Sequence, residues 1–270
     1  MAYKLIAIDI DGTLLTDDKK LPQKNIDAMR AAANAGVEIM MATGRPHKAA
    51  TWVMEQAGIE GLILSAGGTL ACHYPGGETV YEAHLPPELV SEVADYCREN
   101  SLFWHCISGT DVYYETVGAL SQYTDSYFGF PGKVLDFTSA HGITFNKGNI
   151  VLGDESTIDV AKALDDRFGN RVEVLISDKK VIDITPKGVG KGVALLSVAA
   201  LFGLSKDEVI AIGDTDADIS MIQAAGLGVC MENGTPGTIA AADYIAPSNN
   251  DCGVAHVIEK FILKYQQDID

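Results

Sequence analysis

"KLIAIDIDGTLL", residues 4–15, is the stretch that decides the fold. Its apolar run, residues 5–8, has the composition of a strand buried on both faces, as in a parallel sheet. The run breaks at Asp9 and again at Asp11, and a glycine and a threonine follow at once. Two neighbouring carboxylates repel each other unless a cation lies close, so their place at the end of a core strand needs a reason. The simplest alternative is a solvated turn that caps the strand.

Composition narrows the class of protein. The chain has 270 residues, 47% of them hydrophobic, which is enough for a substantial core. Its formal net charge of −17 argues against nucleic acid or an anionic membrane as a partner. No run reaches the length of a membrane span, and the odd number of cysteines without a CxxC spacing indicates reduced thiols. We therefore expect a cytoplasmic protein with no nucleic-acid or membrane partner; the sequence leaves its oligomeric state open.

Short apolar runs alternate with helical patterns along the chain. Strands are expected at residues 5–8, 37–42, 62–64, 209–212, 227–231 and 244–246, and helices at 23–35, 47–57, 192–202 and 219–225. This alternation is typical of an α/β fold with a parallel sheet.

The middle of the chain follows a different pattern. It predicts a helix at 87–99, a hairpin within 102–115 and short strands near 149–152, 172–176 and 181–184. We therefore expect a Rossmann-like parallel-sheet core, residues 1–83 and 188–270, with an α+β cap domain, residues 84–187, inserted into it.

Polar residues end several of the expected core strands. They are Asp9, Thr43, Ser65 and Asp214. Open parallel sheets bind ligands beyond the carboxyl ends of their strands, so residues far apart in sequence can form one site there.

A second acidic cluster lies in "IGDTDADIS", residues 212–220. Its alternating carboxylates suggest a calcium loop, but Ile219 and Ala225 stand where an EF-hand needs glycine and glutamate. Asp214, and with it Asp218, can instead serve a metal at a strand end. The alternative is capping of the following helix, which would account for one of the three aspartates.

Two further motifs offer phosphate contacts. Thr43 and Gly44 precede a helix, where a hydroxyl and backbone N–H groups can cradle an anion, although on its own this motif favours a plain helix cap. Lys191 lies in "TPKGVGKGV", which departs from a P-loop because Gly192 stands where Ser or Thr is required. The lysine is then either a solvated surface charge or a point charge aimed at phosphate.

Taken in order, these motifs resemble the haloacid dehalogenase superfamily of phosphatases. The resemblance rests on DxDGT after the first strand, TGR after the second, a lysine before a late helix and GDxxxD after the next strand. It is closest to the Cof-type sugar-phosphatase branch, whose α/β cap is inserted between the second and third motifs, and it extends over the whole chain.

The resemblance implies specific roles. Asp9 would be the nucleophile that forms an aspartyl-phosphate, and Asp11 the acid and base. Mg²⁺ would be held by Asp9, the backbone carbonyl of Asp11, and Asp214, with Asp218 orienting its ligands from behind. The remaining contacts to the phosphoryl group would come from Ile10 (backbone), Thr43, Gly44 and Lys191.

The implied function is a Mg²⁺-dependent phosphatase that hydrolyses small phosphorylated metabolites, with sugar phosphates as the expected class. Two positions depart from the branch pattern: Ala217 and Ala66 stand where asparagines are usual. The first change removes a hydrogen-bond donor to the transferring phosphate. The alternative function is therefore a phosphometabolite-binding protein with impaired turnover; a signalling receiver domain fits the length and motif order much less well.

Overall fold

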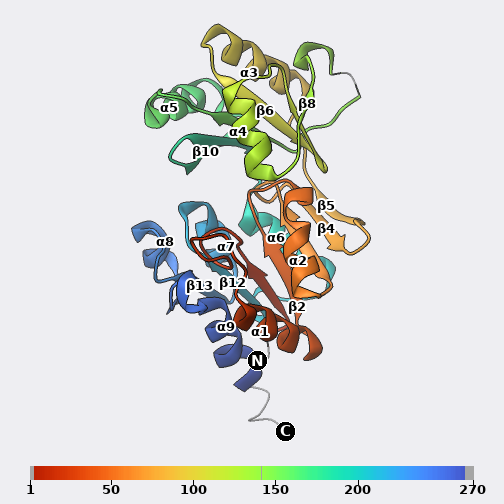
Figure 1. The fold of residues 1–270 in the computed structure, drawn as a ribbon, viewed down its shortest axis with the longest axis vertical. Coiled ribbons are helices and arrows are strands. Elements are labelled where there is room, and N and C mark those ends of the chain that lie inside the picture. The colour runs from red at the N-terminus through yellow and green to blue at the C-terminus, as the bar shows by residue number, and fades with distance from the viewer. Residues whose placement is uncertain (1–2, 141, 265–270) are drawn as a thin grey trace.

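A computed structural model describes residues 3–140 and 142–264. The chain forms two lobes stacked along the long axis, each built on one sheet (Figure 1). The lower lobe contains both ends of the described chain and the first strand. The upper lobe is formed by the middle of the sequence, as expected for an inserted cap.

The core sheet has the strand order β14-β13-β12-β1-β2-β3-β4-β5. Its strands are β1 (Leu5–Ile8), β2 (Glu38–Ala42), β3 (Gly61–Ser65), β4 (Leu70–Tyr74), β5 (Thr79–Glu82), β12 (Val209–Gly213), β13 (Leu227–Met231) and β14 (Tyr244–Ala246). The strands from β14 to β3 are parallel, which confirms the expected core. The sequence did not predict β4 and β5, which extend the sheet in antiparallel fashion.

Helices cover both faces of this sheet. They are α1 (Gln23–Asn34), α2 (Thr51–Ala57), α6 (Lys191–Leu201), α7 (Ile219–Ala224), α8 (Pro236–Ala241) and α9 (Gly253–Ile258). Short 3₁₀-helices form η1 (His47–Ala49), η3 (Lys206–Glu208), η4 (Asp216–Asp218) and η5 (Asn249–Asp251), and α9 continues as the π-helix η6 (Glu259–Leu263). The helix expected at 47–57 is thus divided into η1 and α2.

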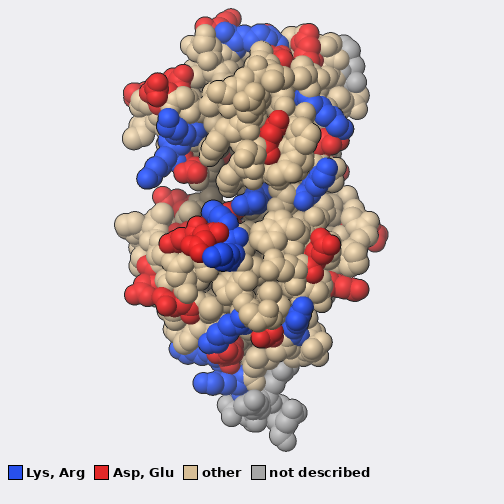
Figure 2. All heavy atoms as spheres, in the orientation of Figure 1, with Lys and Arg blue, Asp and Glu red and all other residues tan. Residues whose placement is uncertain are grey.

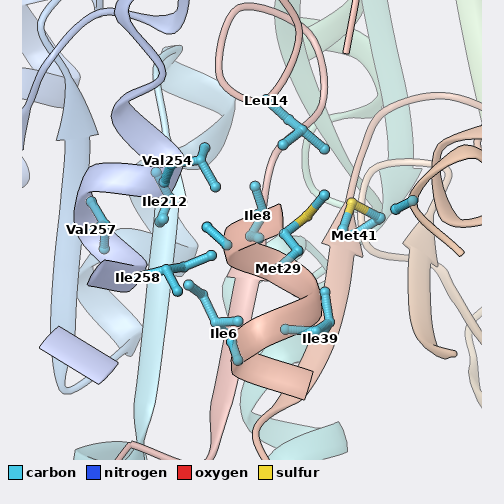
Figure 3. Packing of buried hydrophobic residues seen from close by; sticks show 14 of the residues in the cluster. Ile6, Ile8, Leu14, Met29, Ile39, Met41, Ile212, Val254, Val257 and Ile258 are labelled. Carbon is cyan, nitrogen blue, oxygen red and sulfur yellow. The ribbon is translucent and has the colours of Figure 1, made fainter. Parts of the chain in front are cut away.

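Strand β1 shows why its whole sequence is apolar. Ile6 and Ile8 pack with Met29 of α1 and Ile258 of α9 (Figure 3). Leu5 and Ala7 point to the other face and join the cluster that contains α6. Alternate side chains of a strand lie on opposite faces, so both sets must be hydrophobic here.

The register brings the strand ends to one edge. Ile8 lies opposite Ile212 of β12 and Met41 of β2. The residues that follow these strands, among them Asp9, Thr43 and Asp214, therefore emerge side by side.

The cap sheet has the order β10-β11-β9-β6-β7-β8. Its strands are β6 (Phe103–Ser108), β7 (Asp111–Tyr114), β8 (Lys133–Val134), β9 (Lys147–Val151), β10 (Val172–Asp178) and β11 (Val181–Pro186), and its helices α3 (Pro87–Glu99), α4 (Ala119–Phe128) and α5 (Thr157–Phe168), with the turn η2 (Phe137–Ser139). One face buries Trp104, Ile150 and Ile182 beneath α3 and α5. The borders 83/84 and 187/188 stay predictions.

Among the residues that the model describes, no helix combines the length and apolar character that crossing a lipid bilayer requires.

Candidate active site

A cavity of about 890 Å³ lies between the two lobes. Figure 2 shows the surface hollowed at this level, with basic and acidic side chains gathered beside the hollow. The sequence-predicted residues that line the cavity are Asp9, Asp11, Thr43, Gly44 and Lys191. Ser65 does not contribute: it is fully buried and its hydroxyl donates to the carbonyl of Leu70.

Lys191 joins two of the acidic motifs. It is 5% exposed at the start of α6, and its Nζ lies 2.7 Å from Oδ1 of Asp9 and 2.6 Å from Oδ1 of Asp218. Gly68 makes this placement possible, because a Cβ in its left-handed conformation would overlap the backbone at Gly190 and Lys191. The lysine is therefore a buried point charge at the site and not a solvated surface residue.

Asp214 is oriented by the first motif. The Thr13 hydroxyl donates to Oδ1 of Asp214 at 2.7 Å. This contact is buried, and its two residues are 201 positions apart in sequence. Gly12 has φ of +86°, and a Cβ there would overlap the Asp214 carboxylate. Gly12 thus allows the chain to turn and leaves room for the Asp214 carboxylate.

Asp218 is nearly saturated with hydrogen bonds. Its Oδ2 accepts from the backbone N–H groups of Asp214 and Thr215, at 3.1 and 3.0 Å, and from the Thr215 hydroxyl. Lys191 donates to the other oxygen, Oδ1, so the Asp218 carboxylate fixes the loop that begins at Asp214. Asp216, the other aspartate of this motif, accepts from Thr235 and Thr238 and so tethers α8 instead.

The donor set fits a hard divalent cation. Oxygens of Asp9, Asp214 and Asp218 lie within 4.8 Å of one another, and all three residues are buried. One ammonium group cannot neutralise three carboxylates. Among the described residues, no side chain donates to Oδ2 of Asp9 or Oδ2 of Asp214, so both oxygens are available to such a cation.

The pKa values reflect the excess of carboxylates over ammonium groups in this cluster. Burial raises the pKa of Asp9 well above its usual range, partly opposed by Lys191 and reinforced by Asp218 and Asp214. Burial and the nearby Asp218 likewise raise the pKa of Asp214 to about 6. Burial alone would lower the pKa of Lys191, but the charges of Asp218 and Asp9 outweigh it and raise that pKa, so Lys191 stays protonated.

Asp11 lies apart from the metal cluster. The strand ends at Ile8, the chain turns, and Asp11 accepts from Arg45 Nε at 2.6 Å and Nη2 at 2.8 Å and from Lys19 Nζ at 3.0 Å. Residues 9–11 therefore do not continue the strand that ends at Ile8. Burial would raise the pKa of Asp11, but the hydrogen bonds and charge of Arg45 outweigh it and lower that pKa.

Thr43 and Gly44 form the expected loop after β2. The buried Thr43 hydroxyl accepts from the N–H of Arg45 at 3.2 Å. The carbonyl of Gly44 accepts from Lys147 of the cap, also at 3.2 Å. Ile10 lies between the two catalytic-motif aspartates with its side chain fully buried in the core, so only its backbone can serve the cavity.

The two alanines that depart from the branch pattern have different surroundings. Ala217 lines the cavity and offers no donor. Ala66 has φ of +50°, a region where asparagine is better tolerated than alanine, and it packs with Ile107 and Val112 of the cap. The second change therefore adds an apolar contact between core and cap.

Sequence reasoning missed several residues of the cavity. Arg45 appeared only as part of the TGR motif, yet it holds Asp11 and lies 5.0 Å from the ring centroid of Tyr127 on α4. Cap residues also line the cavity, including His105, Lys147, Asn149, Ser177 and Asp183. Alternating polar residues in "KGNIV" were the available signal, but such a pattern also fits a strand face exposed to solvent.

Comparison with known proteins agrees with this geometry. The family model for haloacid dehalogenase-like hydrolases matches residues 6–258. A Streptococcus pyogenes protein named as a phosphatase is 31% identical over 97% of this chain and 100% of its own. The 5-amino-6-(5-phospho-D-ribitylamino)uracil phosphatase YbjI of Escherichia coli is 29% identical over the whole of both chains.

Solved structures give the same result. A haloacid dehalogenase-like hydrolase from Bacteroides thetaiotaomicron is 30% identical, with a TM-score of 0.86 over 96% of this chain and 99% of that chain. The HAD subclass IIB sugar phosphatase BT4131 shares the fold, with a TM-score of 0.85 at 22% identity over 96% of this chain and 98% of that one. The expected resemblance to Cof-type phosphatases is thereby confirmed.

The chain belongs to the haloacid dehalogenase-like hydrolase family. Within it, this protein is a HAD-type phosphatase, a phosphoric monoester hydrolase.

Proposed function

We propose that this enzyme is a Mg²⁺-dependent phosphatase of small phosphorylated metabolites, with sugar phosphates as the main class, that works through an aspartyl-phosphate. The observation that carries this proposal is Lys191, which lines the cavity and whose ammonium lies between the carboxylates of Asp9 and Asp218. The names of the phosphatase relatives support the substrate class.

In the first step, one carboxylate oxygen of Asp9 attacks phosphorus. A new bond forms from this oxygen to phosphorus, and the bond from phosphorus to the ester oxygen breaks. Asp11 gives a proton to the departing alkoxide. Lys191, Thr43 and the backbone at Ile10 and Gly44 balance charge on the phosphoryl oxygens.

In the second step, water attacks the same phosphorus. Asp11, now a carboxylate, accepts a proton from the water, and the bond between phosphorus and Asp9 breaks. Inorganic phosphate leaves and both aspartates return to their starting state. Because Asp11 must exchange protons in both steps, its ion pair with Arg45 has to loosen during the cycle.

Asp9, Asp214 and the backbone carbonyl of Asp11 would hold Mg²⁺, with Asp218 positioning the loop behind them. When bound, the ion supplies positive charge that offsets the clustered carboxylates and the incoming phosphate. This local cationic character explains how a protein of net charge −17 can accept a phosphorylated substrate.

A second candidate is a phosphometabolite-binding protein with impaired turnover. Ala217 favours it, because this cavity residue cannot donate to the phosphate. Loss of one hydrogen bond to a charged group costs about 1.5–3 kcal/mol, which slows a reaction without emptying the site.

The test is phosphate release from a panel of sugar, nucleotide and cofactor monophosphates, measured with Mg²⁺ and with EDTA. The proposal expects release that requires Mg²⁺ and is greatest for sugar phosphates. Isothermal titration on the same panel distinguishes the second candidate, which requires binding without release.

A further inference from the structure

The cap presents a row of polar side chains to the cavity. His105 of β6 lies opposite Asn149 of β9, and Asn149 lies opposite Asp183 of β11. Lys147 is two residues before Asn149, on the same face of β9. A sheet face that covers another lobe is normally apolar, so a buried polar row requires a reason.

Part of this row is internally satisfied. Oδ1 of Asp183 accepts from Asn149 at 2.5 Å and from the Ser177 hydroxyl at 2.7 Å. Its Oδ2 lies 2.6 Å from Nζ of Lys147, whose side chain is 2% exposed. The carboxylate and the ammonium thus neutralise each other.

The rest of the row has unused hydrogen-bonding capacity. Both ring nitrogens of His105 and Oδ1 of Asn149 are buried without a partner among the described residues. His105 is 2% exposed and Asn149 4% exposed, yet both line the cavity. A neutral imidazole has one donor and one acceptor, and the amide oxygen is an acceptor. Hydroxyl groups, which both donate and accept, complement this set.

The charges argue against a second phosphate in this part of the cavity. The cations that line the cavity are Lys19, Arg45, Lys147 and Lys191, and each is paired with a carboxylate. The cap side also contributes Glu173 and Asp178. A group that binds here should therefore be hydroxylated and uncharged.

We propose that His105 and Asn149, held by the Lys147–Asp183 pair, form a subsite that binds the hydroxyl groups of the substrate's leaving group. This inference rests on the proposed phosphatase function and deepens it: the preferred substrates are monophosphates of neutral polyhydroxylated molecules. An ester without hydroxyl groups would leave the buried polar atoms unpaired.

The test compares glucose 6-phosphate with p-nitrophenyl phosphate, which has no hydroxyl group in its leaving group's ring. The variants are Asn149→Leu and His105→Phe, with Val151→Ala as the matched control. Val151 lies on the same face of β9 and lines the same cavity, but it has no polar side-chain atom. The ratio of the two kcat/KM values is the readout, because general damage to the fold lowers both.

In Asn149→Leu and His105→Phe the ratio should fall at least about tenfold, mainly through kcat/KM for glucose 6-phosphate. In Val151→Ala it should stay near the wild-type ratio. The wild-type enzyme should also prefer fructose 6-phosphate to fructose 1,6-bisphosphate. An unchanged ratio in both polar variants, or preference for the bisphosphate, would overturn the subsite.

A separate measurement keeps this inference distinct from the proposed function. If the wild-type protein hydrolyses neither ester, the proposed function fails. Titration calorimetry with glucose 6-phosphate then tests the subsite on its own. Binding at least about tenfold weaker in Asn149→Leu than in Val151→Ala supports it. Equal dissociation constants, or no binding by the wild-type protein, overturn it.

Discussion

Arg45 holds Asp11 through two hydrogen bonds, from Nε at 2.6 Å and from Nη2 at 2.8 Å. The same guanidinium lies over the ring of Tyr127, which belongs to the cap. Asp11, the proposed acid and base, is therefore linked to the cap through the Arg45 side chain.

Replacing Arg45 should change the pH dependence of the reaction. Arg45 lowers the pKa of Asp11, so Arg45→Gln should raise it. The limb of the kcat/KM profile that reports Asp11 should then move to higher pH. Lys48→Gln is the control, because Lys48 lies over the ring of Phe130 and does not contact Asp11. A profile unmoved in Arg45→Gln would contradict the role assigned to this pair.

Mg²⁺ should stabilise the folded protein. Ligand at 100 times its dissociation constant adds about 2.7 kcal/mol to the free energy of unfolding. Urea denaturation with and without Mg²⁺ should show this gain in the wild-type protein and lose most of it in Asp214→Asn. Asp216→Asn should keep the gain, since Asp216 binds Thr235 and Thr238 and not the cluster. Equal gains in both variants would place the ion elsewhere.

Restoring the usual asparagine should increase activity. Ala217→Asn would supply a hydrogen bond to a charged group, which is worth about 1.5–3 kcal/mol, or roughly 10- to 160-fold in kcat/KM. Ala217→Val adds volume without a donor and should give no increase. Steady-state kinetics on the best substrate of the panel measures both, and a loss of activity in Ala217→Asn would show that this chain positions phosphate differently.

His105 should make the fold sensitive to mild acid. Burial and the nearby charge of Lys147 lower its pKa to about 3, while Asn149 acts in the opposite direction without being aligned to hydrogen-bond either ring nitrogen. Below about pH 6.5 the unfolded chain binds a proton that the folded protein excludes, so stability falls as pH falls, until about pH 3.

This contribution amounts to about 2 kcal/mol between pH 7 and pH 5. Urea denaturation at the two pH values should show it as the difference between the wild-type protein and His105→Phe, because the raised pKa values of Asp9 and Asp214 act in the opposite direction in both proteins. His105→Phe should lose that share of the pH dependence. If His105→Phe keeps the full dependence, the histidine is protonated in the folded state.

The sequence was sufficient to predict the parts of the site that lie at strand and helix ends. Asp9, Thr43 and Asp214 each follow a buried apolar run, and a parallel sheet must gather such residues at one edge. Lys191 could be placed at a helix start, but its burial depends on the close approach of Gly68 and on carboxylates far apart in sequence.

Other features depend on contacts that no local pattern encodes. The Arg45–Asp11 pair exists because the chain turns after β1, where an extended strand would have kept the two aspartates together. The row at His105, Asn149 and Asp183 alternates like a solvent-exposed strand face, and only the docking of the cap buries it. Strands β4 and β5 continue the sheet beyond its parallel part, where alternation with helices no longer applies.

The most direct test of the central claim is to trap the covalent intermediate. Enzyme mixed with its best sugar phosphate and Mg²⁺ is quenched, reduced with borohydride and digested, and the peptide that contains residues 4–15 is analysed by mass spectrometry. An aspartyl-phosphate is reduced to homoserine, so we expect homoserine at position 9, and none when EDTA is present or in Asp9→Asn. Unmodified Asp9 during active turnover, or phosphate release by Asp9→Asn at the wild-type rate, would contradict the mechanism.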